Sequence, residues 1–371
     1  MELLNATRLM AAYTQGLAPD GRESLVVVAK GTFDLPLDGR EASLAEVQRP
    51  LLMADEYVGE PGLSAPRQEM DFAPVKPFCD VLVMGKAHAP NGRPTTQITA
   101  GIRVGRVSKA FSVLGPRQWV PGALGAAPGA PQPFIEQDIG YAHAFGGSHA
   151  MADRPDFTDS YLANPAGRGW YPRSASTADI VGMPMPNTEA LGQPIDSPHG
   201  NFTPMALGPI GRHWPPRIGH AGTYDEAWLA DHFPFLPPDF DTRYYQAAPP
   251  DQQTEYLQGG EDVLLLNLTQ QERAGFKVPR MQVPVTFFLK KNRHERVHAV
   301  IDTLVIDTDA RQVEITWRTS RILKKDMFEI PQILVGEMPR AWWRARELGK
   351  DYYTSLEALS RAKRAREDAL R

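Results

Sequence analysis

The stretch TTQITAGIRVGRVSKAFSVLG, residues 95–115, decides the fold class of this chain. Its first half places apolar residues at every second position, namely Ile98, Ala100, Ile102 and Val104. Thr99 and Arg103 fall between them. A period of two puts the apolar side chains on one face of an extended strand and the others on the opposite face. The stretch therefore predicts β-structure that is buried on one side.

Other segments on both sides of this stretch also have the composition of strands. They are rich in β-branched and other apolar residues, and they cover residues 23–35, 77–89, 261–269, 281–291, 296–308 and 312–323. Such runs are typical of strands. Asn91-Gly92 predicts a tight turn, and residues 308–311 predict a hairpin between the last two runs.

These runs form two groups, which are separated by a long segment of a different kind. Residues 126–260 contain many prolines, glycines and aromatic residues and show little periodicity. Proline accounts for 34 of the 371 residues, about 9%, where roughly 5% is usual, and it interrupts both helices and ladders. We therefore expect a mainly-β chain with two β-sandwich-like units, residues 1–125 and 261–335. The loop-rich middle joins them, and the helix-forming residues of 336–371 predict a C-terminal α-helix.

Bulk composition excludes several classes of protein. The formal charge of −4 gives no broad basic field of the kind that a dedicated nucleic-acid binder carries. Cys79 is the only cysteine, which rules out an intramolecular disulfide, fits a reducing compartment and predicts a small buried side chain. The N-terminus lacks the pattern of a secretion signal, and no apolar run approaches the roughly 20 residues that span a bilayer. We expect a soluble cytoplasmic protein.

The segment HAGTYDEAWLADHFPFLPPDFDTRYY, residues 220–245, concentrates aromatic rings, carboxylates and prolines. Thr223 and Glu226 have the spacing of a capping box, which predicts a short helix over residues 224–232. The following PPDFD is ordinary turn chemistry. The segment is therefore interpreted as a rigid turn lined by aromatic rings.

None of the familiar catalytic or metal-binding patterns is complete. Residues 146–150, GGSHA, have the spacing of a nucleophile elbow but lack the strand before it and the helix after it. His213, His220, Asp225 and His232 are spaced unlike the ligands of a zinc site. Glycine-rich phosphate-binding loops are missing as well. We therefore expect no catalytic residue, no metal and no cofactor.

Four long motifs resemble the bacterial family called domain of unknown function 2169. They are FIEQDIGYAHAFGG (134–147), NPAGRGWYP (164–172), the segment 219–253 and YLQGGEDVLLLNLT (256–269). The resemblance extends over roughly residues 5–325. Members of that family are associated with type VI secretion clusters, where they are thought to act as adaptors or chaperones. The resemblance implies that this chain helps to load a toxin with a PAAR-like domain onto the secretion spike.

The leading hypothesis is accordingly a cytoplasmic adaptor without enzymatic activity. Its expected partners are the secreted toxin and, as a second candidate, the spike protein, with no nucleic acid or membrane partner. Stiff aromatic loops suit such a surface because ordering them on binding loses little entropy. The candidate partner-binding residues are Tyr224, Trp228, Phe233, Phe235, Phe240, Tyr244 and Tyr245. The same rings are equally consistent with a core between the two β units.

Two other hypotheses stay open at the level of sequence. One is a hydrolase or lyase that acts on a carbohydrate or cell-wall substrate, with the acids of residues 220–245 and His143 or His220 in its cleft. Replacing Asp225 and Asp241 by alanine separates that enzyme from an adaptor. The other is a structural component that stays in the secreted particle, which its presence in the culture supernatant would indicate.

Overall fold

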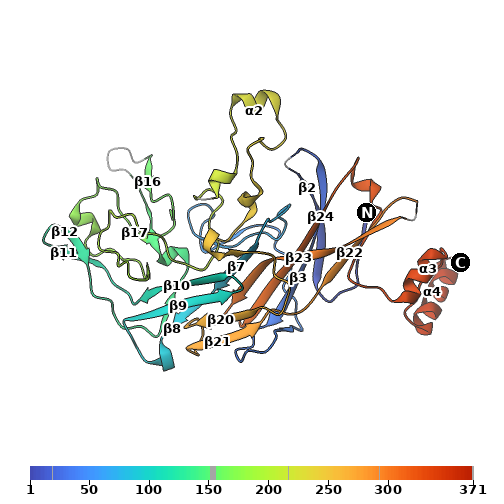
Figure 1. Ribbon diagram of the computed structural model, residues 1–371, viewed down its shortest axis with the longest axis horizontal. Coiled ribbons are helices and arrows are strands. Elements are labelled where there is room, and N and C mark those ends of the chain that lie inside the picture. The colour runs from blue at the N-terminus through green and yellow to red at the C-terminus, as the bar shows by residue number, and fades with distance from the viewer. Residues whose placement is uncertain (19, 151–155, 216, 292, 370–371) are drawn as a thin grey trace.

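The computed structural model describes residues 1–369 except residues 19, 151–155, 216 and 292. Most of its regular structure is β, with a loop-rich middle and short helices (Figure 1). The mainly-β prediction is confirmed.

Among the described residues, ten strands form the larger sheet. Its main path runs in the order β1 (Glu2–Asn5), β25 (Gln332–Val335), β22 (Val283–Phe288), β23 (His294–Asp307), β24 (Gln312–Ile322), β3 (Glu23–Asp34) and β2 (Met10–Leu17). Three further strands pair beside this path, namely β4 (Ser43–Leu44), β7 (Cys79–Met84) and β19 (Gln253–Thr254). β23 and β24 are antiparallel and joined by residues 308–311, which confirms the predicted hairpin.

The smaller sheet contains the stretch that predicted the fold class. Its order is β18 (Thr188–Ala190), β10 (Val107–Leu114), β9 (Gln97–Val104), β20 (Asp262–Leu266) and β21 (Arg273–Lys277). β9 and β10 pair as an antiparallel hairpin, and the four alternating apolar side chains of β9 are buried. The one-sided burial inferred from the period of two is therefore confirmed.

The remaining elements are short. Paired strands are β5 (Glu56–Tyr57) with β6 (Pro66–Gln68), β8 (Lys86–His88) with β13 (Glu136–Asp138), β11 (Trp119–Gly122) with β12 (Gly125–Pro128), β14 (Phe145–Gly146) with β17 (Arg168–Gly169), and β15 (Ser148–Ala150) with β16 (Thr158–Ser160). The α-helices are α1 (Thr177–Ile180), α2 (Glu226–Asp231), α3 (Arg340–Glu347) and α4 (Leu356–Ala369). The 3₁₀ turns are η1 (Pro90–Gly92), η2 (Tyr141–His143), η3 (Ile218–His220), η4 (Thr242–Tyr245), η5 (Pro250–Gln252) and η6 (Met327–Glu329).

The ranges 1–125 and 261–335, each expected to form its own unit, contribute strands to the same two sheets. β24 lies between β23 and β3 in the larger sheet, and β9 lies between β10 and β20 in the smaller one. One hydrophobic core takes side chains from both sheets, such as Val27 and Ile315 from the larger and Ile102 and Val263 from the smaller. Strands satisfy their hydrogen bonds laterally at any sequence separation, so a local pattern does not reveal which strands become neighbours.

The C-terminal tail is two helices rather than one. α3 ends before Gly349, whose φ of 62° is left-handed, and α4 begins only at Leu356. A left-handed glycine is a common terminator of helices. The aromatic residues at the start of the tail pack on the larger sheet, because Trp342 and Trp343 both contact Phe288.

A buried carboxylate on β7 joins the loop-rich middle to the larger sheet. Asp80 is fully buried and accepts hydrogen bonds from Lys76 Nζ at 2.7 Å and Gln246 Nε2 at 2.6 Å. It also accepts from the main-chain N–H groups of Ala247 at 2.8 Å and Ala248 at 3.2 Å. Lys76 is itself buried. The interaction therefore pairs two buried charges and fixes the chain at 246–248 on the sheet.

We expect Asp80→Ala to lower the free energy of unfolding by about 3–5 kcal/mol, because it leaves the Lys76 ammonium buried without its partner. Urea denaturation of the purified protein measures this. Asp262→Ala is the matched control, since Asp262 pairs with Lys277 at 2.6 Å on the surface. That exposed pair contributes about 0–1 kcal/mol. Equal losses in the two variants would contradict the assignment.

Candidate functional site

A projecting loop carries most of the aromatic segment identified in the sequence. We call residues 221–240 the finger. Figure 1 shows α2 at its end, standing away from both sheets. The finger begins after η3 and ends before η4, so the two 3₁₀ turns form its foot.

Polar contacts join the two chain segments at the base of the finger, which we call its neck. Asp241 N donates to His220 O at 3.0 Å. Thr223 donates from its N–H to Asp239 Oδ1 at 2.9 Å and from its hydroxyl to Asp239 Oδ2 at 2.7 Å. These two hydrogen bonds lower the pKa of Asp239, because they stabilise its charged form. Gly222 adopts a φ of 80° where the chains approach most closely.

The helix cap differs from the one predicted. Asp225, rather than Thr223, is the N-cap residue, and its side chain accepts from Trp228 N at 2.8 Å. α2 is accordingly shorter than the predicted 224–232. The predicted capping box of Thr223 and Glu226 is therefore wrong, since the Thr223 hydroxyl is held by Asp239 on the other side of the neck.

Three rings pack against one another at the tip. Trp228 contacts Tyr224 with ring centroids 4.8 Å apart and Phe233 with centroids 5.7 Å apart, both edge to face. Trp228 Nε1 donates to Phe235 O at 2.9 Å. Aromatic pairs in this geometry add about 0.5–1.5 kcal/mol each beyond the area that they bury. The tip is therefore held by its own side chains and by the contact of the Phe235 ring with Gly21, in the turn between β2 and β3.

The outer surface of the tip is apolar. Tyr224 is 53% exposed, Leu229 61%, Phe233 62% and Phe235 48%. Exposed apolar residues that gather in one place mark interaction sites more often than single ones do. Leu229 was not among the predicted partner-binding residues, although its place on α2 between the rings was a usable signal.

The other predicted rings lie at the foot. Phe240, Tyr244 and Tyr245 are half-buried and contact one another, with centroid separations of 5.5–6.0 Å. Burial raises the pKa of Tyr245. The seven predicted residues thus divide into four at the tip and three in the packing of the foot.

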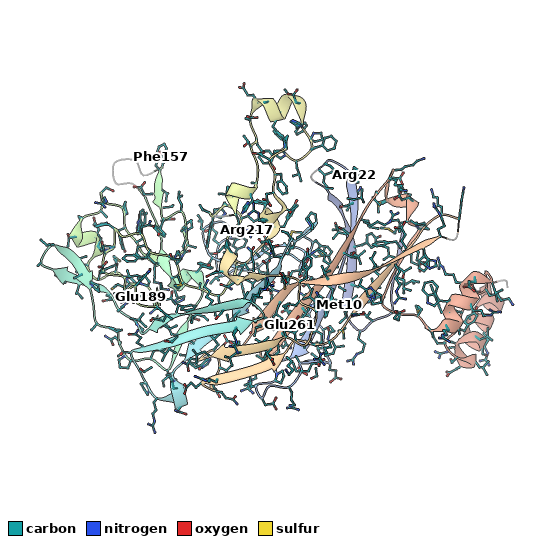
Figure 2. The ribbon with its side chains drawn as sticks, in the orientation of Figure 1. Met10, Arg22, Phe157, Glu189, Arg217 and Glu261 are labelled. Carbon is teal, nitrogen blue, oxygen red and sulfur yellow. The ribbon has the colours of Figure 1, made fainter. Side chains whose placement is uncertain are left out.

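A buried arginine braces the foot from below. Figure 2 labels Arg217, which lies beneath the finger. Arg217 donates to Tyr244 O at 3.2 and 2.9 Å and to Ile210 O at 2.8 Å, and it pairs with the carboxylate of Glu69. Next to it, Arg212 pairs with Asp55 at 3.0 Å. Sequence patterns gave no sign of this brace, because its members come from segments about 150 residues apart.

The finger carries charge of one sign. Its carboxylates Asp225, Glu226, Asp231 and Asp239 are exposed, and residues 221–240 contain no lysine or arginine. The finger therefore carries negative charge both at its neck, on Asp239, and at its tip, on Asp225, Glu226 and Asp231.

The acids of residues 220–245 do not line a cleft together with His143. A cleft of about 460 Å³ contains His143, Tyr141 and Asp138, but the described residues of 220–245 are not part of its wall. Asp225 caps α2, and Asp241 pairs with Arg243 at 2.8 Å, 3.9 Å from His220 Nδ1. His143 therefore lies apart from the acids of residues 220–245, whereas His220 lies beside Asp241.

His143 has cationic and acidic neighbours in that cleft. Its Nδ1 lies 3.0 Å from Arg168 Nη2, and its Nε2 lies 3.8 Å from Asp138 Oδ2. Burial, and then the charge of Arg168, lower the pKa of His143.

The described residues include neither a cluster of metal ligands nor a membrane-spanning helix. No three His, Cys, Asp or Glu side chains gather among them in a way that could hold a metal ion. Of the helices described, none is long and apolar enough to cross a membrane. Cys79 is fully buried, as the sequence predicted, and burial raises the pKa of its thiol.

The lowered pKa of His143 predicts a loss of stability in mild acid. In the unfolded chain the imidazole takes up a proton near pH 6.5, whereas in the folded protein it does so only at lower pH. The unfolded chain thus binds more protons in that interval, so this contribution is complete above about pH 6.5 and is lost as the pH falls. We expect His143→Gln to flatten the decline in urea midpoint between about pH 7 and about pH 5.5. The control is His232→Gln, at an exposed site, which should leave the decline in urea midpoint unchanged. The prediction is refuted if the urea midpoints of the unchanged protein and of both variants fall in parallel as the pH is lowered.

Comparison with known proteins places the chain in a family. Residues 20–318 match the family described as "Uncharacterized protein conserved in bacteria (DUF2169)". Neither a curated protein nor a solved structure matches the chain. The match covers well over half of the 371 residues and includes the whole finger. The chain therefore belongs to the DUF2169 family of bacterial proteins.

Proposed function

We propose that this protein is a cytoplasmic adaptor, without enzymatic activity of its own, that binds a type VI secretion toxin with a PAAR-like domain. In this role it helps to load the toxin onto the secretion spike. The observation that carries the proposal is the braced finger with its exposed aromatic tip. The motifs that resemble the family, one of which (residues 219–253) contains the whole finger, support the choice of partner.

The construction of the finger suits protein recognition. Large rings anchor many interfaces, and a handful of central residues usually provide most of the binding energy. The tip rings already pack on Trp228, so they lose little conformational entropy when a partner covers them. The Arg217 brace and the neck hydrogen bonds hold the tip at a fixed place above the sheets.

The charge of the finger indicates the chemistry of the partner surface. Asp225, Glu226 and Asp231 lie on or beside α2 at the tip and Asp239 lies at the neck, with no lysine or arginine in the finger to balance them. A complementary surface is an apolar depression with lysine and arginine at its rim. Such a pair attracts at a distance and associates faster at low ionic strength.

The test is binding and secretion of the toxin whose gene neighbours that of the adaptor. We expect Leu229→Ser and Phe233→Ser each to weaken the toxin complex by at least about tenfold, because each removes an exposed apolar anchor. Titration calorimetry with purified toxin measures the affinity, and the secreted toxin is quantified in strains that carry each variant.

Leu124→Ser is the matched control. Leu124 is a fully exposed leucine on the turn between β11 and β12, far from the finger in Figure 1, and its replacement should leave binding and secretion unchanged. If both finger variants bound the toxin as tightly as the unchanged protein does, the finger would not be part of the interface. Normal secretion in a strain that lacks the adaptor would overturn the adaptor role itself.

A further inference from the structure

The larger sheet forks, and the fork leaves one edge of β23 without a neighbouring strand. From Val300 to Asp307, β23 pairs with β24. β24 then continues along β3 through residues 319–322, while residues 294–299 of β23 pair only with β22 on the opposite side. Among the described strands, none pairs with the other side of residues 294–299.

The direction of the free backbone groups follows from Pro284. Its carbonyl accepts from Gly336 N at 2.8 Å, so Pro284 turns its backbone groups away from β23. His298, which lies opposite Pro284 in the register, therefore turns its own N–H and C=O away from β22. Arg296 and His294 follow at intervals of two and face the same open side. The edge thus presents a free backbone N–H donor and a free C=O acceptor at each of these three residues.

This edge is accessible from both faces. Residues 294–298 are all exposed, and even Val297 is 37% exposed. The strand is therefore not covered by the chain that crosses from β24 to β25 or by the C-terminal helices. Natural proteins usually cover or twist such an edge, because it can pair with another extended chain.

The surroundings of the edge are basic. Exposed cationic residues on β23, on the β22–β23 turn and beyond the end of β24 are Lys290, Lys291, Arg293, Arg296, Lys324 and Lys325. Two nearby carboxylates are already paired, Glu295 with Arg321 at 2.7 Å and Glu337 with Arg296, while Glu347 lies in the wall of the adjoining pocket. An incoming segment with acidic side chains would meet complementary charge.

A pocket adjoins one end of the edge. It holds about 240 Å³ and is lined by Phe288, Leu289, Arg293, His294, Trp343, Arg346 and Glu347. The Arg346 guanidinium lies 3.7 Å from the Phe288 ring centroid, and the Trp343 ring lies 5.4 Å from His294. Rings and cations of this kind suit an aromatic side chain.

We propose that residues 294–298 of β23 accept an acidic, extended segment of a partner protein as an added strand, with an aromatic side chain of that segment in the Trp343 pocket. Main-chain hydrogen bonds supply affinity in this mode, and the pocket and charge supply selectivity. This surface is distinct from the finger, so the inference stands whether or not the finger binds a toxin.

The probe is a fluorescein-labelled synthetic peptide of alternating glutamate and valine with a phenylalanine at one end, added to the full-length protein. We expect saturable anisotropy and a clear loss of affinity when the glutamates are replaced by lysine. Two further peptides carry N-methyl groups on alternate residues, one in each register. Only one register faces β23, so one methylated peptide should lose binding and the other should retain it.

Variants of the protein separate backbone pairing from charge. Arg296→Pro and Arg296→Thr both remove the guanidinium, but only proline also removes the N–H that faces the open edge. We expect the Arg296→Pro protein to bind the peptide about fivefold more weakly than the Arg296→Thr protein does. Trp343→Ala should weaken peptide binding as well. Circular dichroism and urea midpoints for each variant establish that the fold is kept.

Three results would overturn this inference. They are the absence of saturable binding, equal binding by the two methylated peptides, and equal affinities for the proline and threonine variants. Light scattering that shows a dimer dissociated by Arg296→Pro would assign the edge to a second copy of this chain instead.

Discussion

The finger depends on buried charges that fix the chain at both of its ends. On the outgoing side, Asp80 on β7 binds the main chain of residues 247 and 248. On the incoming side, Arg217 binds the carbonyl of Tyr244 and the carboxylate of Glu69. A buried charge that loses its partner is strongly destabilising, so these contacts tolerate little displacement. The projecting loop therefore starts and ends at fixed points.

The two surfaces inferred from the structure differ in sign and in chemistry. The finger presents exposed aromatic side chains together with carboxylates, and the β23 edge presents free backbone groups among lysines and arginines. A partner surface that suits one is repelled by the other, because like charges at close range are unfavourable. The two proposed sites would therefore select partners of opposite charge.

The sequence predicted local structure well where one face of a strand is buried. The alternation in residues 95–115 indicates which side chains face the core, and the turn residues at 308–311 predict a hairpin. Neither pattern indicates which strands that are distant in sequence become neighbours in a sheet. The sharing of both sheets by residues 1–125 and 261–335 therefore could not be anticipated.

The candidate site was predicted only in part, for a related reason. Ring type gives no information on burial in an aperiodic loop, so the sequence does not separate the exposed tip rings from the half-buried foot rings. The fork beside β23 lies next to an irregularity between Ile301 and Thr303, which no local composition marks. Asp80, in contrast, was visible as a lone charge in an apolar run, which is a usable signal of a buried pair.

The parallel pairing of β1 with β25 has a consequence for how the chain reaches this structure. Gln332 and Glu2, which hydrogen-bond across it, are 330 residues apart. Closing so long a loop loses entropy before any contact compensates for it, and folds rich in such pairs form slowly. During synthesis β1 has no partner strand until β25 has been made. Until then its exposed edge is open to wrong pairings, which makes the folding rate, rather than final stability, the more vulnerable property of this protein.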